Sequence, residues 1–198
     1  MSVRKTIATY DRIAGEYTRR WQDRGAIAPA LVRFTGQLSP GALVLDVGCG
    51  PGFDSVTLRS RGLRVMGLDL SWGMLQSARA HYPGAYVQAD MRQLPLAGGV
   101  EGIWCNAALL HLAREEATRT LRDFHRVLQG DGVVFLSVKE GQAEAQRSDA
   151  YGPDAPRFFT FWQDEQLDEA LQNSGLHCIE SWTDGKETGR WLCRLAKK

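Results

Sequence analysis

A glycine-rich turn directly after a short apolar run constrains the fold more than any other part of this sequence. Residues 41–47 read GALVLDV, which is typical of a strand buried on both faces of a parallel sheet. The turn GCGPG at 48–52 has glycine at alternate positions, so the backbone can turn sharply and approach a ligand without interference from Cβ atoms. The apolar run and the glycine-rich turn together predict a buried strand, a ligand-binding turn and a following helix whose free N–H groups face the ligand.

The rest of the chain alternates strand-like and helix-like segments. Apolar β-rich runs occur at 63–69, 85–89, 100–105 and 133–138, and helical patterns occur at 54–61, 72–81, 114–128 and 164–174. Two more β-rich runs, at 176–182 and 190–195, flank a glycine-containing turn and predict an antiparallel hairpin. This order predicts an α/β fold with a doubly wound, mostly parallel sheet and helices on both faces, which binds ligands beyond the carboxyl ends of its strands.

Composition and spacing argue against several classes of protein. The chain has 24 Lys and Arg against 23 Asp and Glu, and a net charge of +1 provides no global field for nucleic acid or an anionic membrane. The four cysteines lie far apart without a C-x-x-C pair, so we expect buried free thiols, no disulfide and no metal site. No stretch has the length of a membrane span and no apolar leader begins the chain, so we expect a cytoplasmic protein.

Acidic residues stand at the ends of successive predicted strands. Asp46 lies at the end of the first strand and Asp69 at the end of the second, where a carboxylate can accept the hydroxyls of a ribose held over the glycine turn. Asp90 follows the third strand with Met91, a pair that suits an adenine amino group and ring. Taken alone, Asp69 also suits a helix cap and Asp90 a solvated loop. A dinucleotide site would need G-x-G-x-x-G, but Phe53 occupies the position of its third glycine.

Four segments together resemble a known family. They are LDVGCGPG at 45–52, GLDLS at 67–71, QADMRQLPL at 88–96 and NAALLHL at 106–112. In combination they are similar to class I S-adenosylmethionine-dependent methyltransferases, especially the small-molecule group related to ubiquinone-biosynthesis enzymes, over roughly residues 10–140. The resemblance implies S-adenosylmethionine as methyl donor, S-adenosylhomocysteine as product, and a Rossmann-like sheet of seven strands that ends in the antiparallel hairpin.

The resemblance also implies roles for individual positions of this sequence. The family places the first acid and the glycine turn around the methionine moiety, the second acid at the ribose, the Asp-Met pair at the adenine and backbone carbonyls near the sulfonium. The corresponding residues here are Asp46, Gly48, Cys49, Gly50 and Gly52 for methionine, Asp69 with Leu70 for ribose, Asp90 and Met91 for adenine, and Asn106 and Ala107 for the sulfonium. Tyr10 and Tyr17 fit a segment that closes over the cofactor, or else the apolar face of a terminal helix.

The regions around this core have separate expected roles within a single domain of 198 residues. We expect a helical cap or lid at 1–38, the cofactor-binding core at 41–139, a substrate-side loop at 140–162 and the C-terminal helix and hairpin at 163–198. The loop is rich in aromatic residues, which suit either the wall of an acceptor pocket or the core. We interpret Arg157 as a surface arginine, the alternative being a partner for an acceptor carboxylate.

Methyl transfer from a sulfonium needs alignment of nucleophile, methyl and sulfur more than side-chain chemistry. A hydroxyl or acidic acceptor would also need a base, and His111 is the imidazole close to a cofactor motif, unless it has only a packing role. We expect a small-molecule acceptor and a monomer or homodimer. Alternatives are an RNA or protein methyltransferase, or a non-catalytic S-adenosylmethionine-binding regulator. Nucleic acid is disfavoured because Asn106 begins Asn-Ala-Ala-Leu and not the Pro-Pro motif of amino-group enzymes.

Overall fold

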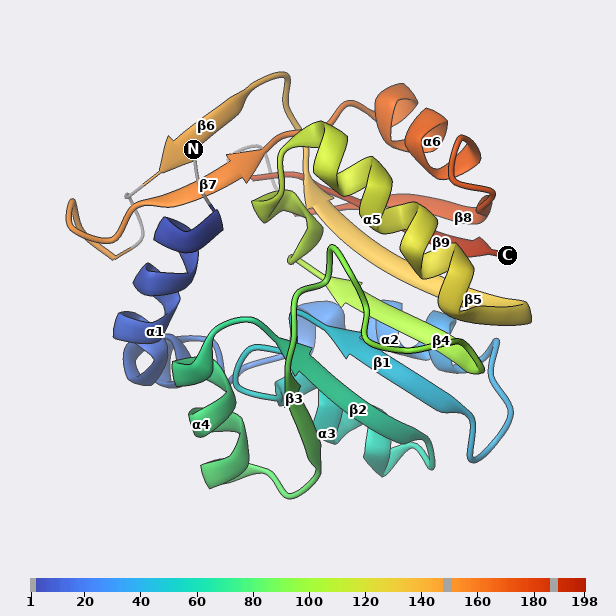
Figure 1. Cartoon of the computed structure of the whole chain (residues 1–198), viewed down its shortest axis with the longest axis horizontal. Coiled ribbons are helices and arrows are strands. Elements are labelled where there is room, and N and C mark those ends of the chain that lie inside the picture. Colours follow the sequence, from blue (N-terminus) through green and yellow to red (C-terminus); the bar gives the residue numbers. More distant parts are fainter. Residues whose placement is uncertain (1–2, 148–150, 186–188) are drawn as a thin grey trace.

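The computed structural model describes residues 3–147, 151–185 and 189–198. Within these residues seven strands form one sheet: β1 (Leu43–Val47), β2 (Arg64–Asp69), β3 (Ala85–Gln88), β4 (Val100–Asn106), β5 (Leu128–Lys139), β8 (His177–Asp184) and β9 (Trp191–Lys197). Their order is β3-β2-β1-β4-β5-β9-β8, with β1 to β5 parallel and β9 antiparallel to both of its neighbours (Figure 1). The predicted mostly parallel, Rossmann-like sheet with an antiparallel C-terminal hairpin is confirmed.

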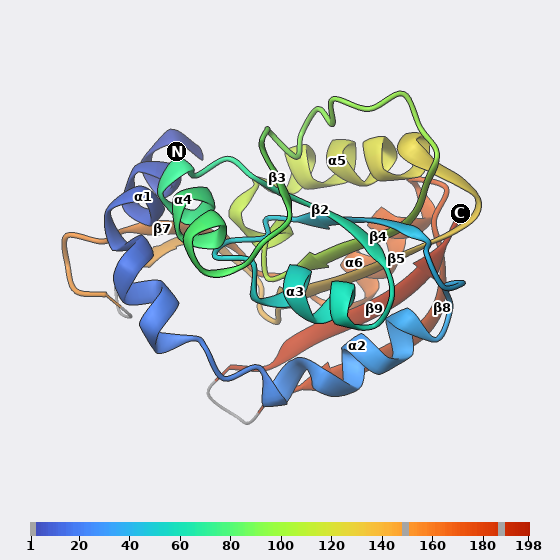
Figure 2. The ribbon, with the colours of Figure 1, turned by 90° about the horizontal axis from the view of Figure 1, so that it is seen from below.

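Helices cover both faces of this sheet, because alternate residues of each buried strand are apolar on opposite sides. On one face α2 (Ala28–Thr35) and α3 (Phe53–Ser60) pack Phe34 and Leu58 against Val44. On the other face α5 (Arg114–Val127) and α6 (Asp164–Gln172) pack Phe124 and other apolar residues into the cluster that contains Leu45. Figure 2 shows the sheet between α5 above and the α2 and α3 layer below.

Two further helices lie near the edge at which β1 and β4 end. They are α1 (Val3–Arg20) and α4 (Trp72–His81), and they contact each other (Figure 1). Ser71 begins α4 as predicted, since its Oγ accepts the Met74 N–H at 3.2 Å. In the described part of the chain, no helix combines the length and the apolar character that a membrane span requires.

The region 140–162 differs from the predicted loop. β6 (Glu144–Arg147) and β7 (Arg157–Thr160) pair as an antiparallel hairpin outside the main sheet. The polar residues, Gly and Pro between 140 and 157 give no local strand pattern, and β7 is fixed by distant partners: Thr160 Oγ1 donates to Leu112 O at 2.6 Å, and Phe158 N donates to Thr6 Oγ1 at 3.1 Å. Parts of the predicted lid, loop and hairpin turn, at 1–2, 148–150 and 186–188, lie outside the described residues.

The cysteines are unpaired, but they are not all buried. Cys49, Cys105 and Cys193 are buried, whereas Cys178 is exposed. The prediction of a buried thiol is wrong for Cys178 because it lies on β8, the edge strand of the sheet, whose first three residues are exposed.

Candidate active site

Two adjoining cavities lie at the ends of the parallel strands. The smaller has a volume of about 90 Å³ and includes the glycine turn and the end of β2. The larger has a volume of about 790 Å³ and extends from α1 to the β6–β7 hairpin and the start of β9. Among the described residues, five line both cavities: Tyr10, Tyr17, Asn106, Ala107 and His111. The cavities therefore meet along this set of side chains, which we call the shared wall.

The structure brings most of the predicted residues together at the smaller cavity. Those that line it are Tyr10, Tyr17, Gly48, Gly50, Asp69, Leu70, Asp90, Met91, Asn106, Ala107 and His111. Sequence reasoning missed Val3, Thr6, Ile7, Leu68, Met74, Ala89, Ala108 and Leu112. A signal existed for part of this set, because Val3 and Ile7 share the helical face of Tyr10 at i, i+4 and i+7 spacing.

The glycine turn adopts a conformation that other residues tolerate poorly. Gly48 has a φ of +70°, and a Cβ added there would lie 2.3 Å from the Ala108 Cβ. Gly50 has a φ of +52°, and an added Cβ would meet no heavy atom within 4 Å. Gly48 is therefore required for close packing inside the protein, whereas Gly50 leaves room that a ligand in the smaller cavity can use.

Asp69 is fixed beside this turn by backbone N–H groups. Its Oδ2 accepts from Gly50 N and its Oδ1 accepts from Ser71 N, each at 2.8 Å. Burial raises the pKa of Asp69, and the backbone hydrogen bonds from Ser71 and Gly50 limit that rise. An ionised carboxylate can accept about four hydrogen bonds, more than the backbone supplies here, so a ribose role for Asp69 fits this geometry.

Asp46, which precedes the turn, and Cys49 and Gly52, which belong to it, do not line the smaller cavity. Asp46 is buried, and its Oδ2 accepts from Ser55 Oγ at 2.5 Å. Burial, followed by the nearby charge of Asp54, raises the pKa of Asp46 to about 7. The three residues shape the backbone of the turn.

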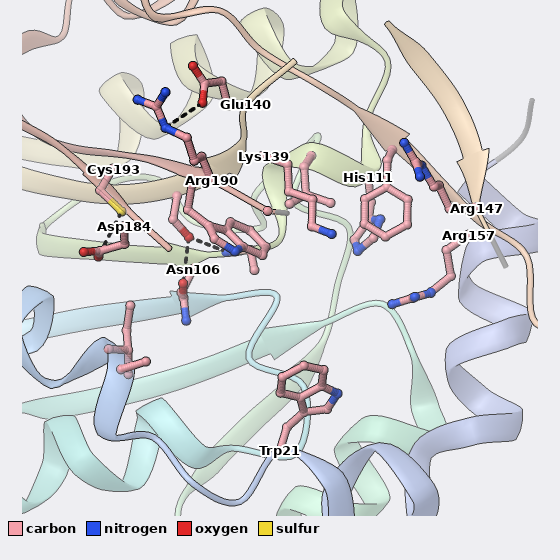
Figure 3. Close-up of a pocket in the computed structure, with 18 of the residues that line it drawn as sticks. Trp21, Asn106, His111, Lys139, Glu140, Arg147, Arg157, Asp184, Arg190 and Cys193 are labelled. Atoms are coloured by element: carbon pink, nitrogen blue, oxygen red, sulfur yellow. Dashed lines mark hydrogen bonds and ion pairs between the residues drawn. The ribbon is translucent and has the colours of Figure 1, made fainter. Parts of the chain in front are cut away.

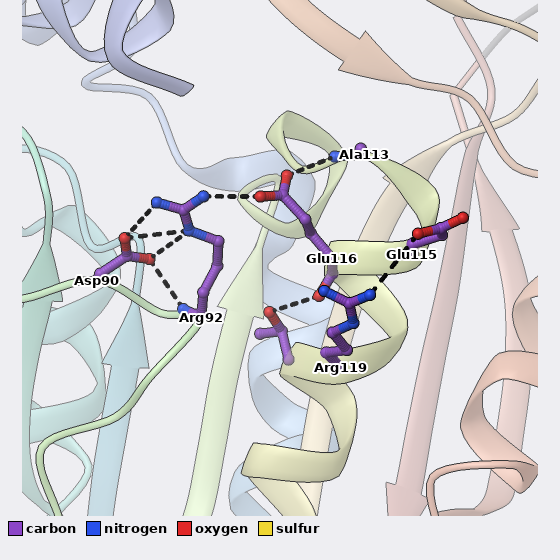
Figure 4. Close-up of polar contacts among 7 residues, drawn as sticks. Asp90, Arg92, Ala113, Glu115, Glu116 and Arg119 are labelled. Carbon is purple, nitrogen blue, oxygen red and sulfur yellow. Dashed lines mark hydrogen bonds and ion pairs between the residues drawn. The ribbon is translucent and has the colours of Figure 1, made fainter. Parts of the chain in front are cut away.

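Asp90 is part of an ion-pair network that reaches α5 (Figure 4). Arg92 contacts both Asp90 oxygens, with Nη2 2.7 Å from Oδ2, and its Nη1 lies 2.7 Å from Glu116 Oε1. Partial burial acts to raise the pKa of Asp90, but hydrogen bonds from Arg92 outweigh it and lower the pKa. Asp90 is therefore an ionised acceptor held at the cavity edge, next to Met91.

Asp54 anchors the end of β4 and was missed by sequence reasoning. Its Oδ2 accepts from Arg24 Nη2 at 2.6 Å, from Trp104 Nε1 at 2.9 Å and from Asn106 Nδ2 at 3.0 Å. Ser137 Oγ donates to Asn106 Oδ1 at 2.7 Å. Both the nitrogen and the oxygen of the Asn106 side chain are thus hydrogen-bonded within the protein, which leaves one amide N–H and the backbone to face a ligand.

Ala107 completes this strand end in a strained conformation. Its φ of +55° lies in the left-handed region, and its N–H donates to Ser137 Oγ at 2.9 Å. A residue with a side chain in this region is uncommon and marks a backbone fixed by its surroundings. Ala107 therefore gives the shared wall a rigid backbone between the two cavities.

Tyr10 and His111 form a hydrogen-bonded pair in the shared wall. His111 Nδ1 lies 2.7 Å from Phe158 O, which can only accept, so Nδ1 carries the proton. His111 Nε2 then accepts from Tyr10 Oη, also at 2.7 Å. Burial, together with the positive charges of Arg157 and Lys139, lowers the pKa of His111 to about 4, so the ring is neutral at pH 7.

The helix α1 lines both cavities and is held on the start of α4. Asp11 Oδ1 accepts from Ser71 Oγ at 2.6 Å and from Gly73 N at 2.9 Å. Tyr10 and Tyr17 stack edge to face, with ring centroids 5.9 Å apart. Burial raises the pKa of Tyr10 to about 12 and raises that of Tyr17 as well, so both hydroxyls stay protonated. Both tyrosines line both cavities, as a covering segment requires.

The aromatic residues of 151–162 divide between cavity and core. Phe159 and Phe161 line the larger cavity, whereas Trp162 is fully buried in the main core cluster. Arg157 is not the predicted surface arginine: its side chain lines the larger cavity with 8% of the residue exposed (Figure 3). It is buried because β7 lies against α1, with the ring of Tyr10 close to the guanidinium.

Known proteins share this fold and these motifs. A family model described as a methyltransferase domain matches residues 44–132. A malonyl-[acyl-carrier protein] O-methyltransferase of Hamiltonella defensa subsp. Acyrthosiphon pisum is 31% identical over 84% of this chain and 67% of its own length. A ubiquinone biosynthesis O-methyltransferase of Pseudomonas paraeruginosa is 31% identical over 67% of this chain and 61% of its own length. The chain spans 55% of a second malonyl-[acyl-carrier protein] O-methyltransferase, from Pseudescherichia vulneris.

A solved structure agrees over the whole chain. The 1,6-didemethyltoxoflavin-N1-methyltransferase of Burkholderia thailandensis, with bound 1,6-didemethyltoxoflavin and S-adenosylhomocysteine, superposes with a TM-score of 0.78 at 22% identity, covering 100% of this chain and 91% of that one. The fold and the methyltransferase relatives thus define an enzyme that uses an adenosyl cofactor. The chain belongs to the class I S-adenosylmethionine-dependent methyltransferases, as its sequence motifs predict.

Proposed function

We propose that this enzyme transfers the methyl group of S-adenosylmethionine to a small-molecule acceptor bound in the larger cavity. The observation that carries the proposal is the shared wall, which places the cavity lined by the predicted cofactor residues and the larger cavity of about 790 Å³ on two sides of the same five residues. An in-line displacement needs this arrangement, because nucleophile, methyl carbon and sulfur must lie on one line in a site that excludes water.

The residues of the smaller cavity fit the donor. In the proposed complex the Asp69 carboxylate accepts the ribose hydroxyls, Asp90 accepts from the adenine amino group, and Met91 packs on the ring. The open space above Gly50 and the backbone around Ala107 suit the methionine moiety and the sulfonium. The cofactor supplies a methyl group already activated by positive sulfur, so the protein has mainly to hold the two substrates in register.

For acceptors that carry a proton on the attacking atom, we propose that Tyr10 and His111 take it up. The hydrogen bond from Tyr10 Oη to His111 Nε2 is oriented by the second bond to Phe158 O, the arrangement of a base with its positioning group. Proton uptake by this pair would proceed from acceptor to the Tyr10 oxygen as the Tyr10 proton moves to His111. Positioned bases contribute about 10²- to 10⁴-fold to rate.

The pair is tested by a double-mutant cycle. Tyr10→Phe and His111→Ala should each lower kcat at least tenfold with little change in S-adenosylmethionine affinity, and the double variant should be no slower than the slower single variant. Wild-type kcat in His111→Ala, with any acceptor that loses a proton, would exclude the base role.

A second candidate is an acceptor delivered on a carrier protein. Relatives at 31% and 35% identity are named as methyltransferases of malonyl-[acyl-carrier protein], and this observation favours an acyl group that enters the larger cavity while its carrier stays outside. The chain covers 67% and 55% of the length of those relatives.

The direct experiment uses methyl-labelled S-adenosylmethionine with a metabolite extract and mass spectrometry of the labelled products. Label in low-molecular-weight compounds supports the proposal, and label on an acyl-carrier protein supports the second candidate. Label found only in RNA or in other proteins would overturn both. Asp69→Ala serves as the control for dependence on the smaller cavity, and its labelling should fall with its cofactor affinity.

A further inference from the structure

Arg157 is a buried cation for which the described part of the chain supplies no carboxylate partner. The residue is 8% exposed, and its guanidinium lies 5.0 Å from the ring centroid of Tyr151 and 5.1 Å from that of Phe159. Among the described residues no Asp or Glu forms an ion pair with it, and its Nε has no hydrogen-bond partner. Aromatic rings compensate only part of the free energy that a guanidinium loses on desolvation. The burial of Arg157 is therefore unfavourable unless an anion in the cavity pairs with the guanidinium.

The guanidinium lines the larger cavity where other basic side chains also lie. Figure 3 shows Arg157, Arg147, Lys139 and His111 grouped on one side of that cavity. The same figure shows Glu140 and Asp184 away from this group.

Those two acids are already engaged by neighbouring residues. Glu140 pairs with Arg190 at 3.0 Å, and Asp184 accepts from Trp182 Nε1 at 3.1 Å. A third lining acid, Asp23, accepts from Gly25 N at 2.8 Å. The described acids of this cavity are therefore engaged elsewhere, and the basic group around Arg157 suits an anion.

We propose that Arg157 recognises the methyl acceptor through a negatively charged group, so that the acceptor of this enzyme is an organic anion bearing a carboxylate or a phosphate. The inference rests on the proposed function, since it takes the larger cavity as the acceptor site. A guanidinium suits both groups because its N–H donors form parallel, charge-assisted bonds with planar or tetrahedral oxyanions.

The anion would bind close to the point of methyl transfer. Arg157 Nη1 lies 3.5 Å from Tyr10 Oη, and Tyr10 belongs to the shared wall. A carboxylate there either anchors the acceptor or is itself the nucleophile. In the second case an oxygen lone pair forms the new O–C bond, the C–S bonding pair passes to sulfur, and the products are a methyl ester and S-adenosylhomocysteine with no proton to remove.

The activity test divides a metabolite extract on an anion exchanger at pH 7 and offers each fraction with methyl-labelled S-adenosylmethionine. We expect label in compounds from the retained, anionic fraction. Arg157→Gln should lower kcat/KM for the labelled acceptor about 10- to 100-fold, which corresponds to about 1.4 to 2.7 kcal/mol. Arg157→Lys should keep part of the activity because it keeps the charge. Loss of the label on mild alkaline treatment identifies a methyl ester, and retention identifies an anchoring role.

A binding test does not depend on turnover. Saturation-transfer NMR on the full chain loaded with S-adenosylhomocysteine compares benzoate with benzamide, which share their shape and differ in charge. Benzoate should bind better than benzamide, and Arg157→Gln should abolish the difference. Arg33→Gln is the matched control, because Arg33 also lies over an aromatic ring, 4.9 Å from the Trp182 centroid, but is paired with Glu180 and lies outside both cavities.

The thermal stability of the Arg157 variant distinguishes a role in acceptor recognition from a structural role. Arg157→Gln removes an unpaired buried charge, so its thermal midpoint should equal or exceed that of the wild type, whereas a residue required for packing would lower it. Label confined to the unretained fraction, or equal kcat/KM in Arg157→Gln and wild type, would refute the anion while leaving the proposed function standing. Absence of label from every small-molecule fraction would refute the proposed function, and the benzoate comparison would still decide on Arg157.

Discussion

Gly50 allows the cofactor turn to be tested without disturbing the fold. Its φ is +52°, and an added Cβ would meet no heavy atom within 4 Å, so Gly50→Ala introduces no clash within the protein. The left-handed conformation costs an alanine about 1 to 2 kcal/mol. In a chain of this size that loss lowers the thermal midpoint by about 2 to 8 °C.

Cofactor affinity should fall independently of this loss of stability. Gly50 lines the smaller cavity, and its N–H donates to Asp69 Oδ2 at 2.8 Å, so the turn cannot retreat from a ligand without breaking that bond. A methyl group placed here competes with the cofactor for space. We expect at least a tenfold weaker affinity for S-adenosylhomocysteine, equivalent to about 1.4 kcal/mol or more.

Gly41 provides the matched control. Its φ is +81°, an added Cβ would also meet nothing within 4 Å, and it lines neither cavity. Gly41→Ala should therefore show a similar loss of stability by urea unfolding and unchanged affinity by calorimetry. Wild-type affinity in Gly50→Ala would refute the placement of the cofactor over this turn. An equal loss of affinity in Gly41→Ala would show that the effect is global.

Four further predictions concern Asp69, His111, Asp54 and the helix α1. Asp69→Ala should weaken S-adenosylmethionine binding tenfold or more through lost charge-assisted hydrogen bonds, and unchanged calorimetric affinity would exclude the ribose role. The pKa of His111 is about 4 against an ordinary 6.5, so only the unfolded chain binds this proton between those values. The free energy of unfolding should thus be highest above pH 6.5 and decrease as the pH falls towards 4. Urea titration at pH 7 and pH 5 measures this decrease, and the part that His111 contributes should disappear in His111→Gln. Asp54→Ala should destabilise the protein by about 3 kcal/mol because Trp104 Nε1 loses its buried acceptor, and a loss below 1 kcal/mol would contradict that dependence. S-adenosylhomocysteine should slow proteolytic cleavage within α1, and cleavage at the same rate with and without it would argue against a covering helix.

Local patterns determined the sheet and the cofactor turn. The strands β1, β2 and β4 are apolar runs of five to seven residues, and glycines mark the turn at 48–52. Both patterns lie within short contiguous segments, so these elements were predictable from the sequence alone. Asp69 and Asp90 were predictable for the same reason, since parallel strands end at one edge and bring their following residues together. The identity of the methyl donor is thus encoded in contiguous segments.

The acceptor side was decided only by the tertiary structure. Tyr10 and His111 are separated by 101 residues, and Arg157 meets Tyr10 across 147, so no local pattern relates them. Sequence alone therefore placed Arg157 at the surface, gave the β6–β7 hairpin as a loop and left Asp54 unnoticed as an anchor. Burial and charge pairing depend on what the folded chain packs against each residue. Contiguous segments of the sequence therefore specify the residues proposed to bind the donor, whereas the packing of α1 and β7 against the strand ends decides the lining of the larger cavity, the proposed acceptor site.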